Sequence, residues 1–345
     1  MPSQGSMRRS FPMISPHAFE HPLDRAALER LEKVPLLNQV LKTINGLVAE
    51  RSVRLLYQAQ SVQVSADQLS HLHKILIDCV RILDLPEVPE LFVTQNPVVN
   101  AGVFGATRPI IIMNSASLEL FTSDELRFML GHELGHILSN HVLYKTLVKT
   151  ALKLTLPLLT RLGLPVAGIA LQSLLMALLE WDRKSELSAD RAALLCVQNP
   201  DVGYRVLMKT AGGVIGTELN VEAFVAQAEA YEKTPDSSEA VLKLLHLLGG
   251  SHPFPVTRVS HLKKWVDSGA YQAILDGHFE LRTARSEGME RPLEDDTPDG
   301  SSLGEQRLSG LFNAIGETIG AARQNLEARV KTMMHQDSHD LDTKD

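Results

Sequence analysis

The sequence predicts a mainly helical α+β domain with one small β-sheet, and three observations support this fold class. Apolar residues recur at helical spacing through most of residues 23–283. Short runs rich in β-branched residues interrupt that pattern, and the last of them leads into a helix that carries the segment 131–136. We therefore expect a small sheet beside this helix. The three runs lie at 91–93, 98–104 and 109–114.

The run Ile110–Met113 comes immediately before the helix with the segment 131–136. A strand in this place could line a cleft, and an open strand edge is a natural platform for an extended peptide. The two glycines of the segment, Gly131 and Gly135, each cost a helix about 1 kcal/mol relative to alanine. We expect them to permit the close approach of another backbone, that of the strand Ile110–Met113.

The chain divides into four parts. Residues 1–22 are an irregular lead-in that contains several prolines, and residues 23–283 form the main domain. Residues 284–306 are acidic and rich in turn-forming residues, which is typical of a solvated linker. Residues 307–345 predict a C-terminal amphipathic helix and tail.

Helical patterns precede and follow the predicted sheet. One pattern covers residues 24–50, with a break at Asn45-Gly46, and a second covers 65–82, where Ser65 and Gln68 fit a capping box. The later patterns predict helices at 203–210, 219–233, 238–248, 256–266 and 269–276.

Composition narrows the classes of function and the compartment. The chain has 345 residues, and its net charge of −7 argues against a nucleic-acid partner, for which a basic surface is expected. Cys79 and Cys196 lie in apolar helical patterns, which indicates buried thiols and a reducing compartment. The first residues contain no apolar stretch of the length that a secretory signal needs. We expect a cytoplasmic location and predict no particular oligomeric state.

The segment 162–179 is nearly all apolar and bears on membrane association. It contains Pro165 and Gly168 and reaches about the 18 residues that a membrane span needs. We favour a buried or membrane-touching helical hairpin over a transmembrane helix. The protein is therefore expected to be cytoplasmic, with this segment either buried or in peripheral contact with a membrane.

The segment 131–136 has the residues of a metal site. On a helix, His132 and His136 lie one turn apart on the same face, so that both imidazoles can bind one zinc ion. Glu133 would then lie beside a metal-bound water and act as its base. Thr122 and Glu125 fit a capping box at the start of this helix.

A hydrolytic zinc site needs a third protein ligand. The positions after His136 do not fit a metzincin, because Ser139 and Val142 stand where Gly and His are needed. A thermolysin-like ligand about twenty residues further on is also absent. The remaining candidates form a carboxylate cluster, in which Glu186 is favoured because Asp190 lies one turn later and could orient a histidine. The cluster consists of Glu180, Asp182, Glu186 and Asp190.

Several motifs in order over about residues 70–265 resemble the zinc endopeptidase family of HtpX, the CAAX prenyl proteases and the mitochondrial Oma-type proteases. The motifs that carry the resemblance are Asn100-Ala101-Gly102, the strand that ends at Asn114, HExxH at 132–136 with His141, ExxxD at 186–190, and His252-Pro253 with Arg258. The membrane members of this family have clear transmembrane helices, whereas this chain has only the segment 162–179. It is more similar to soluble or peripherally associated bacterial members.

The resemblance implies a zincin-like metalloprotease domain and a zinc cofactor. It implies that His132, His136 and Glu186 bind the zinc ion and that Asp190 and Arg258 support them. His252 corresponds to the family's residue that stabilises the oxyanion. Asn100 is expected to lie near the residues that support the zinc ligands or near the substrate.

The expected function is zinc-dependent endopeptidase activity on a protein or peptide substrate, in which Glu133 activates a zinc-bound water. The alternative is a catalytically silent or latent protein that keeps the zinc-holding fold as a chaperone or interaction scaffold. A latent enzyme could be held shut by the N-terminal lead-in or the C-terminal helix. Cleavage of an unfolded protein, measured with and without a chelator, discriminates between these functions.

Overall fold

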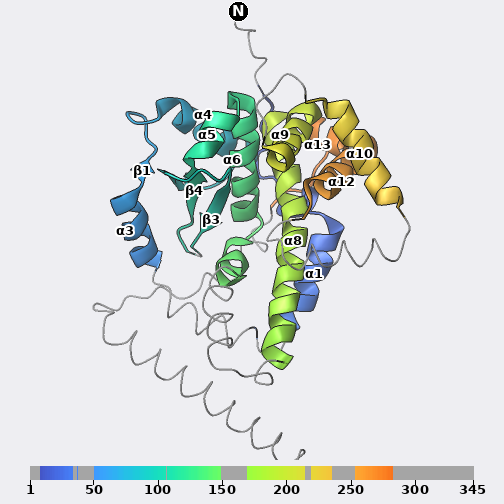
Figure 1. Cartoon of the computed structure of the whole chain (residues 1–345), viewed down its shortest axis with the longest axis horizontal. Coiled ribbons are helices and arrows are strands. Elements are labelled where there is room, and N and C mark those ends of the chain that lie inside the picture. The colour runs from blue at the N-terminus through green and yellow to red at the C-terminus, as the bar shows by residue number, and fades with distance from the viewer. Residues whose placement is uncertain are drawn as a thin grey trace, which may run out of the picture.

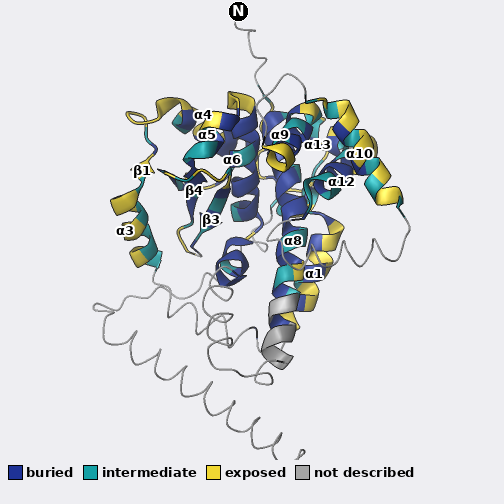
Figure 2. Ribbon diagram, viewed as in Figure 1, coloured by how far each residue is buried: buried dark blue, intermediate teal, exposed yellow. Residues whose placement is uncertain are grey.

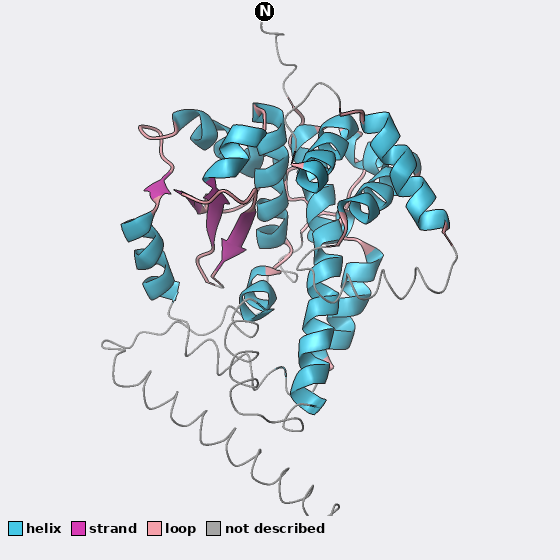
Figure 3. Ribbon diagram, viewed as in Figure 1, coloured by secondary structure: helices cyan, strands magenta, loops and turns pink. Residues whose placement is uncertain are grey.

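Two central helices organise the protein. The computed structural model describes residues 8–33, 37, 50–105, 107–148, 169–213, 219–234 and 253–282. Helix α6 (Ser123–Leu138) and helix α8 (Ile169–Val197) lie side by side, and the sheet flanks α6 (Figures 1 and 3). Helix α9 (Pro200–Gly212) contacts both α6 and α8, and on the other side of α8 lie α10 (Val221–Lys233), α12 (Pro255–Asp267) and α13 (Ala270–Leu275). The mainly helical α+β class is confirmed.

The sheet has four strands in the part of the chain that the structure describes. They are β1 (Val62–Gln63), β2 (Glu90–Thr94), β3 (Ala101–Phe104) and β4 (Ile110–Asn114), and their order is β1-β2-β4-β3. Strands β2 and β4 are parallel, whereas β1 pairs with β2 and β3 with β4 in the antiparallel direction. The three predicted runs are confirmed as strands, and β1 was not predicted.

The strand order corrects the expectation that Ile110–Met113 offers an open edge. These residues lie in β4, which has β2 on one side and β3 on the other, so its backbone pairs within the sheet. The strand at the edge beside α6 is β3. Sequence periodicity identifies strands but not their lateral order, because pairing between strands depends on long-range contacts.

The start of α6 agrees with the predicted capping box. The Thr122 side chain accepts a hydrogen bond from the backbone N–H of Glu125, and the backbone N–H of Thr122 donates to Oε2 of Glu125 at 2.8 Å. Glu125 also binds Lys209 at 2.7 Å and Arg205 at 3.2 Å, both on α9. The motif helix is thus capped locally and attached to α9.

The N-terminal helices differ from the prediction in their bounds. Helix α1 covers Pro22–Glu32, and residues 34–36 and 38–49 of the predicted pattern at 24–50 lie outside the described residues. Helix α3 at Glu50–Gln60 was not predicted. Helix α4 covers Ser70–Leu83 and so begins after the predicted start at residue 65. The Ser65 hydroxyl does accept from the N–H of Gln68 at 3.1 Å, but it closes a turn, and the helix begins only after Leu69, whose φ is 54°.

The stretch before α1 packs into the domain although it is irregular. It includes a short 3-10 helix at Pro16–Ala18, and a single bridge pairs Ile14 with Leu281. Phe11, Ile14 and Phe19 are almost completely buried in the main core. Figure 2 shows the same burial on the facing sides of α6, α8 and α9.

Helix α8 is a single helix of 29 residues that takes in the second half of the apolar segment 162–179. Leu174 and Leu178 are buried in a second cluster with Trp181 and residues of α1. Among the described residues, none of the helices is long and apolar enough to cross a membrane. The first half of the segment, the predicted helix at 238–248 and residues 284–345 lie outside the described part of the chain.

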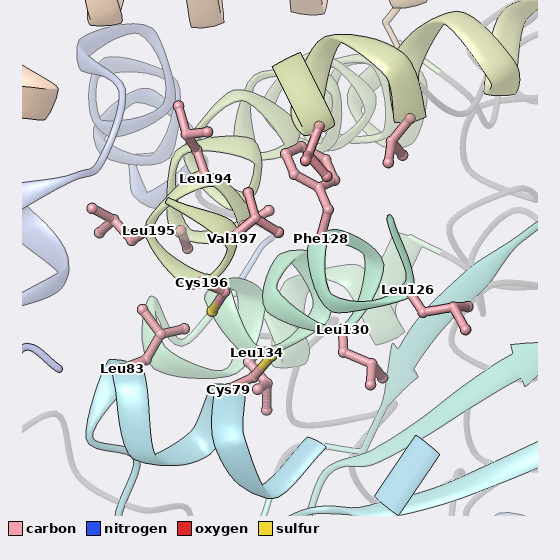
Figure 4. Packing of buried hydrophobic residues seen from close by; sticks show 14 of the residues in the cluster. Cys79, Leu83, Leu126, Phe128, Leu130, Leu134, Leu194, Leu195, Cys196 and Val197 are labelled. Atoms are coloured by element: carbon pink, nitrogen blue, oxygen red, sulfur yellow. The ribbon is translucent and has the colours of Figure 1, made fainter. Parts of the chain in front are cut away.

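The contact between α6 and α8 explains the glycines of the motif helix. A Cβ atom built on Gly131 would lie 2.9 Å from Sγ of Cys196, and one built on Gly135 would meet Ala189 and Ala192. Figure 4 shows Cys196 of α8 packed against α6 beside Cys79 of α4. The prediction that the strand Ile110–Met113 requires these glycines is therefore wrong, because the backbone that approaches them belongs to α8.

Candidate metal centre

Three ligand groups converge between α6 and α8. His132 and His136 come from adjacent turns of α6, and Glu186 comes from the middle of α8; one ligand atom of each lies within 4.8 Å of the others. Nε2 of His132 is 3.3 Å from Oε2 of Glu186, and Nε2 of His136 is 3.2 Å from Oε1. Ligand atoms about 2 Å from one tetrahedral zinc ion are about 3.3 Å apart, so this donor set fits zinc.

His132 is oriented by a buried carboxylate. Its Nδ1 lies 3.0 Å from Oδ1 of Asp190, which receives two hydrogen bonds from Arg258 on α12, at 2.8 and 2.6 Å. Burial raises the pKa of Asp190, but Arg258 and His132 outweigh that effect and lower it. An ionised Asp190 only accepts hydrogen bonds, so His132 carries a proton on Nδ1. Burial lowers the pKa of His132, but Glu186 and Asp190 outweigh that effect and raise it to about 9, and a metal ion at Nε2 would take the place of the second proton.

His136 is oriented through a second histidine. Its Nδ1 lies 3.0 Å from Nδ1 of His141, and Nε2 of His141 lies 3.2 Å from Oδ2 of Asp24 on α1. Nε2 of His136 is buried and has no hydrogen bond in the described part of the chain. A buried nitrogen without a hydrogen-bond partner is costly unless another ligand takes its lone pair, which favours a metal ion between the histidines and Glu186.

Glu186 is held by a buried lysine. Nζ of Lys145, in the helical stretch 142–148, donates to Oε1 of Glu186 at 2.6 Å and to Oδ1 of Asp182 at 2.8 Å. Burial lowers the pKa of Lys145, but the two carboxylates outweigh it and raise the pKa. Sequence reasoning missed this residue, although a lysine in the apolar run after the motif was a signal that a buried carboxylate needed a partner.

Glu133 is buried beside the histidine pair. Only 4% of its surface is exposed, and its charge acts on Arg258. Burial lowers the pKa of Arg258, and Asp190, Glu186 and Glu133 together raise it well above its ordinary value. The site therefore combines three converging ligands, an adjacent carboxylate and one shared guanidinium.

Two predicted site residues stand apart from this group. Asn100 is exposed just before β3, and its described bonds run through its backbone to Ser117 and Asn114. His252 lies outside the described residues. The structure brings the other six predicted residues into one buried group, namely His132, Glu133, His136, Glu186, Asp190 and Arg258.

The fold and this group of residues define a metalloprotease. The chain belongs to peptidase family M48, whose model matches residues 66–266. It is also 38% identical over 263 residues to plastoglobule-localized metallopeptidase 48, a chloroplastic protein of Arabidopsis thaliana, and the match covers 74% of each chain. No solved structure matches the sequence. The resemblance found in the motifs is thereby confirmed, and protein or peptide substrates follow from this class of enzyme.

Proposed function

We propose that the protein is a zinc-dependent endopeptidase in which Glu133 is the general base. The convergence of two buried imidazole nitrogens on the Glu186 carboxylate is the observation that carries the proposal. His132, His136 and Glu186 would hold the zinc ion. When bound there, zinc lowers the pKa of water and polarises the carbonyl of the scissile bond.

Each of the other residues has a defined task in this proposal. Glu133 accepts a proton from the attacking water and returns it to the amine that leaves. Asp190 keeps His132 in the tautomer that presents Nε2, and Arg258 keeps Asp190 ionised. His252 donates a hydrogen bond to the oxyanion, and Asn100 binds the substrate backbone near β3.

Replacing Glu133 tests the proposed base. The Glu133→Gln variant is expected to bind zinc as the wild type does but to cleave unfolded casein at a rate lower by about 100-fold or more, because the amide cannot accept the proton. Glu119→Gln changes an exposed carboxylate on α5 (Ser115–Leu120) and serves as the matched control. Undiminished cleavage by a purified Glu133→Gln variant would overturn the mechanism.

The same assay separates this function from the scaffold alternative. A zinc-loaded wild type that cleaves neither casein nor other unfolded proteins would favour the scaffold.

For His252, an alanine variant is expected to lower kcat by about 100-fold with little change in zinc content, because an oxyanion donor acts only on the transition state.

We also propose a reducing, cytoplasmic compartment with at most peripheral membrane contact. The two buried cysteines are free thiols, which supports the reducing compartment. Leu174 and Leu178 of the segment 162–179 pack within the protein. The named relative is a plastoglobule-localized protein. Sedimentation with lipid vesicles, with and without a high-salt wash, tests peripheral contact.

A further inference from the structure

A chain of hydrogen bonds connects the candidate metal centre to the N-terminal helix. His136 contacts His141 through their Nδ1 atoms at 3.0 Å, and His141 contacts Asp24 at 3.2 Å. Asp24 lies in the first turn of α1, before the residues 66–266 that match the family model. The family match therefore does not cover Asp24, the last residue in this series of hydrogen bonds.

The position of Asp24 is fixed from several sides. The Ser188 hydroxyl on α8 donates to Oδ2 of Asp24 at 2.5 Å, and the same hydroxyl accepts from the backbone N–H of His21 at 2.9 Å. The His21 side chain caps α1 by accepting from the N–H of Leu23. Only 2% of Asp24 is exposed, so its carboxylate lies in the interior. A buried carboxylate is costly unless hydrogen-bond donors or a positive charge pair with it.

These contacts define a direction for the protons. Burial raises the pKa of Asp24, but His141 and Ser188 outweigh that effect and lower it, so the carboxylate is ionised and only accepts. His141 must then donate through Nε2, and in the neutral imidazole this leaves Nδ1 as an acceptor. His136 in turn donates through Nδ1 and presents the lone pair of Nε2, the atom that lies 3.2 Å from Glu186.

We propose that Asp24 is a positioning residue for the metal site: acting through His141, it fixes the tautomer and ring orientation of His136, so that the N-terminal segment is part of the zinc-binding apparatus. The inference rests on the proposed zinc function. Carboxylates that orient metal-binding histidines raise metal affinity, and their loss typically costs 10- to 100-fold. Here a second histidine transmits the effect.

Zinc affinity of the full-length protein tests this role. Competition against a chromophoric zinc indicator is expected to show about 10- to 100-fold weaker binding for Asp24→Asn. Glu29→Gln, an exposed position on the same helix, should leave the affinity unchanged. In a His141→Phe background, Asp24→Asn should cause no further loss of zinc affinity. If Asp24→Asn acted through a general effect on folding, its loss of affinity would add to the loss caused by His141→Phe. Unchanged affinity in Asp24→Asn, or fully additive losses, would overturn the inference.

A measurement on the wild type does not depend on how the variants fold. The ¹⁵N chemical shifts of the zinc-loaded protein should show His141 protonated at Nε2 and unprotonated at Nδ1. The reverse tautomer would contradict the proposed direction of the hydrogen bonds from His136 through His141 to Asp24. A wild type that binds no zinc would refute the proposed function itself, which separates that failure from a failure of the role of Asp24.

Discussion

Gly135 on α6 faces Ala192 on α8 so closely that a Cβ atom on Gly135 would lie 2.6 Å from the Cβ atom of Ala192. It would also lie 3.2 Å from Cα of Ala189, which is backbone and cannot rotate away. The two helices are therefore in contact along their main chains next to His132 and His136. This contact, together with Gly131 against Cys196, sets the distance between the ligands on α6 and the ligand on α8.

Gly135→Ala is expected to lower the free energy of unfolding by about 1–3 kcal/mol, because the added methyl group overpacks the interface. In an unhindered helix the same change would stabilise by up to about 1 kcal/mol. Gly212→Ala, near the end of α9 with nothing within 4 Å of the added atom, is the matched control and should not destabilise. Chemical denaturation measures both, and equal effects at the two sites would contradict the packing argument.

Lys145→Met is expected to destabilise the metal-free protein by about 3–5 kcal/mol, because it removes the buried cation that two buried carboxylates, Glu186 and Asp182, share. Lys184→Met provides the control, since Lys184 pairs with Glu180 on the surface of α8 and such a pair contributes about 0.5 kcal/mol. Urea denaturation in the presence of a chelator makes the comparison. Similar losses for the two variants would show that Lys145 is not a structural counterion.

The capping residue Glu125 gives a prediction about pH. Burial raises its pKa, but Lys209 and the N–H of Thr122 outweigh this and lower the pKa below its ordinary value of 4.5. Because the folded state binds the proton less readily than the unfolded state, the stabilisation is complete above pH 4.5 and is lost as the pH falls through the folded-state value.

Glu125→Gln should therefore cost about 1.5–3 kcal/mol at neutral pH, and the difference from the wild type should shrink in acid. Unfolding free energies measured across this pH range check the trend. Glu222→Gln, at an exposed position of α10, should show no such difference at any pH. A difference for Glu125→Gln that widens on acidification would mean that the sign of the argument is wrong.

Zinc is expected to raise the melting temperature of the chelator-treated protein. A ligand that binds only the folded state at 100 times its Kd stabilises by about 2.7 kcal/mol. The His136→Ala variant lacks one of the three converging ligands and should show little increase at the same zinc concentration. Differential scanning fluorimetry compares the two proteins. An equal increase in both would place the zinc ion elsewhere.

Some features of the fold follow from local sequence, whereas others depend on contacts between distant segments. The capping box at Thr122 and the histidine spacing on α6 follow from one helical segment, and both were predictable. Ser65 shows the limit of this reasoning, because the same local bonds that cap a helix can also close a turn. The order of the strands, the continuity of α8 and the partner of the motif glycines depend on contacts between distant segments, which periodicity does not encode.

The same distinction holds within the site. Glu186 and Asp190 were predictable because they share one helical face and match a known motif. Lys145 and Asp24 were not, since no spacing links either of them to Glu186 or His136. Only the folded chain shows which buried side chains Lys145 and Asp24 contact.

The glycine and alanine contacts between α6 and α8 have a consequence for how this protein can vary. The two helices hold His132 and His136 in register with Glu186 by direct contact, so the residues that join the helices do not determine that spacing. Insertions or deletions in the connection between residues 149 and 168 should leave the ligand geometry intact. A one-residue deletion inside α8 between Glu186 and Cys196 would instead rotate the glutamate about 100° away from the histidines. The connection between α6 and α8 can therefore vary in length, whereas α8 must keep its register against α6.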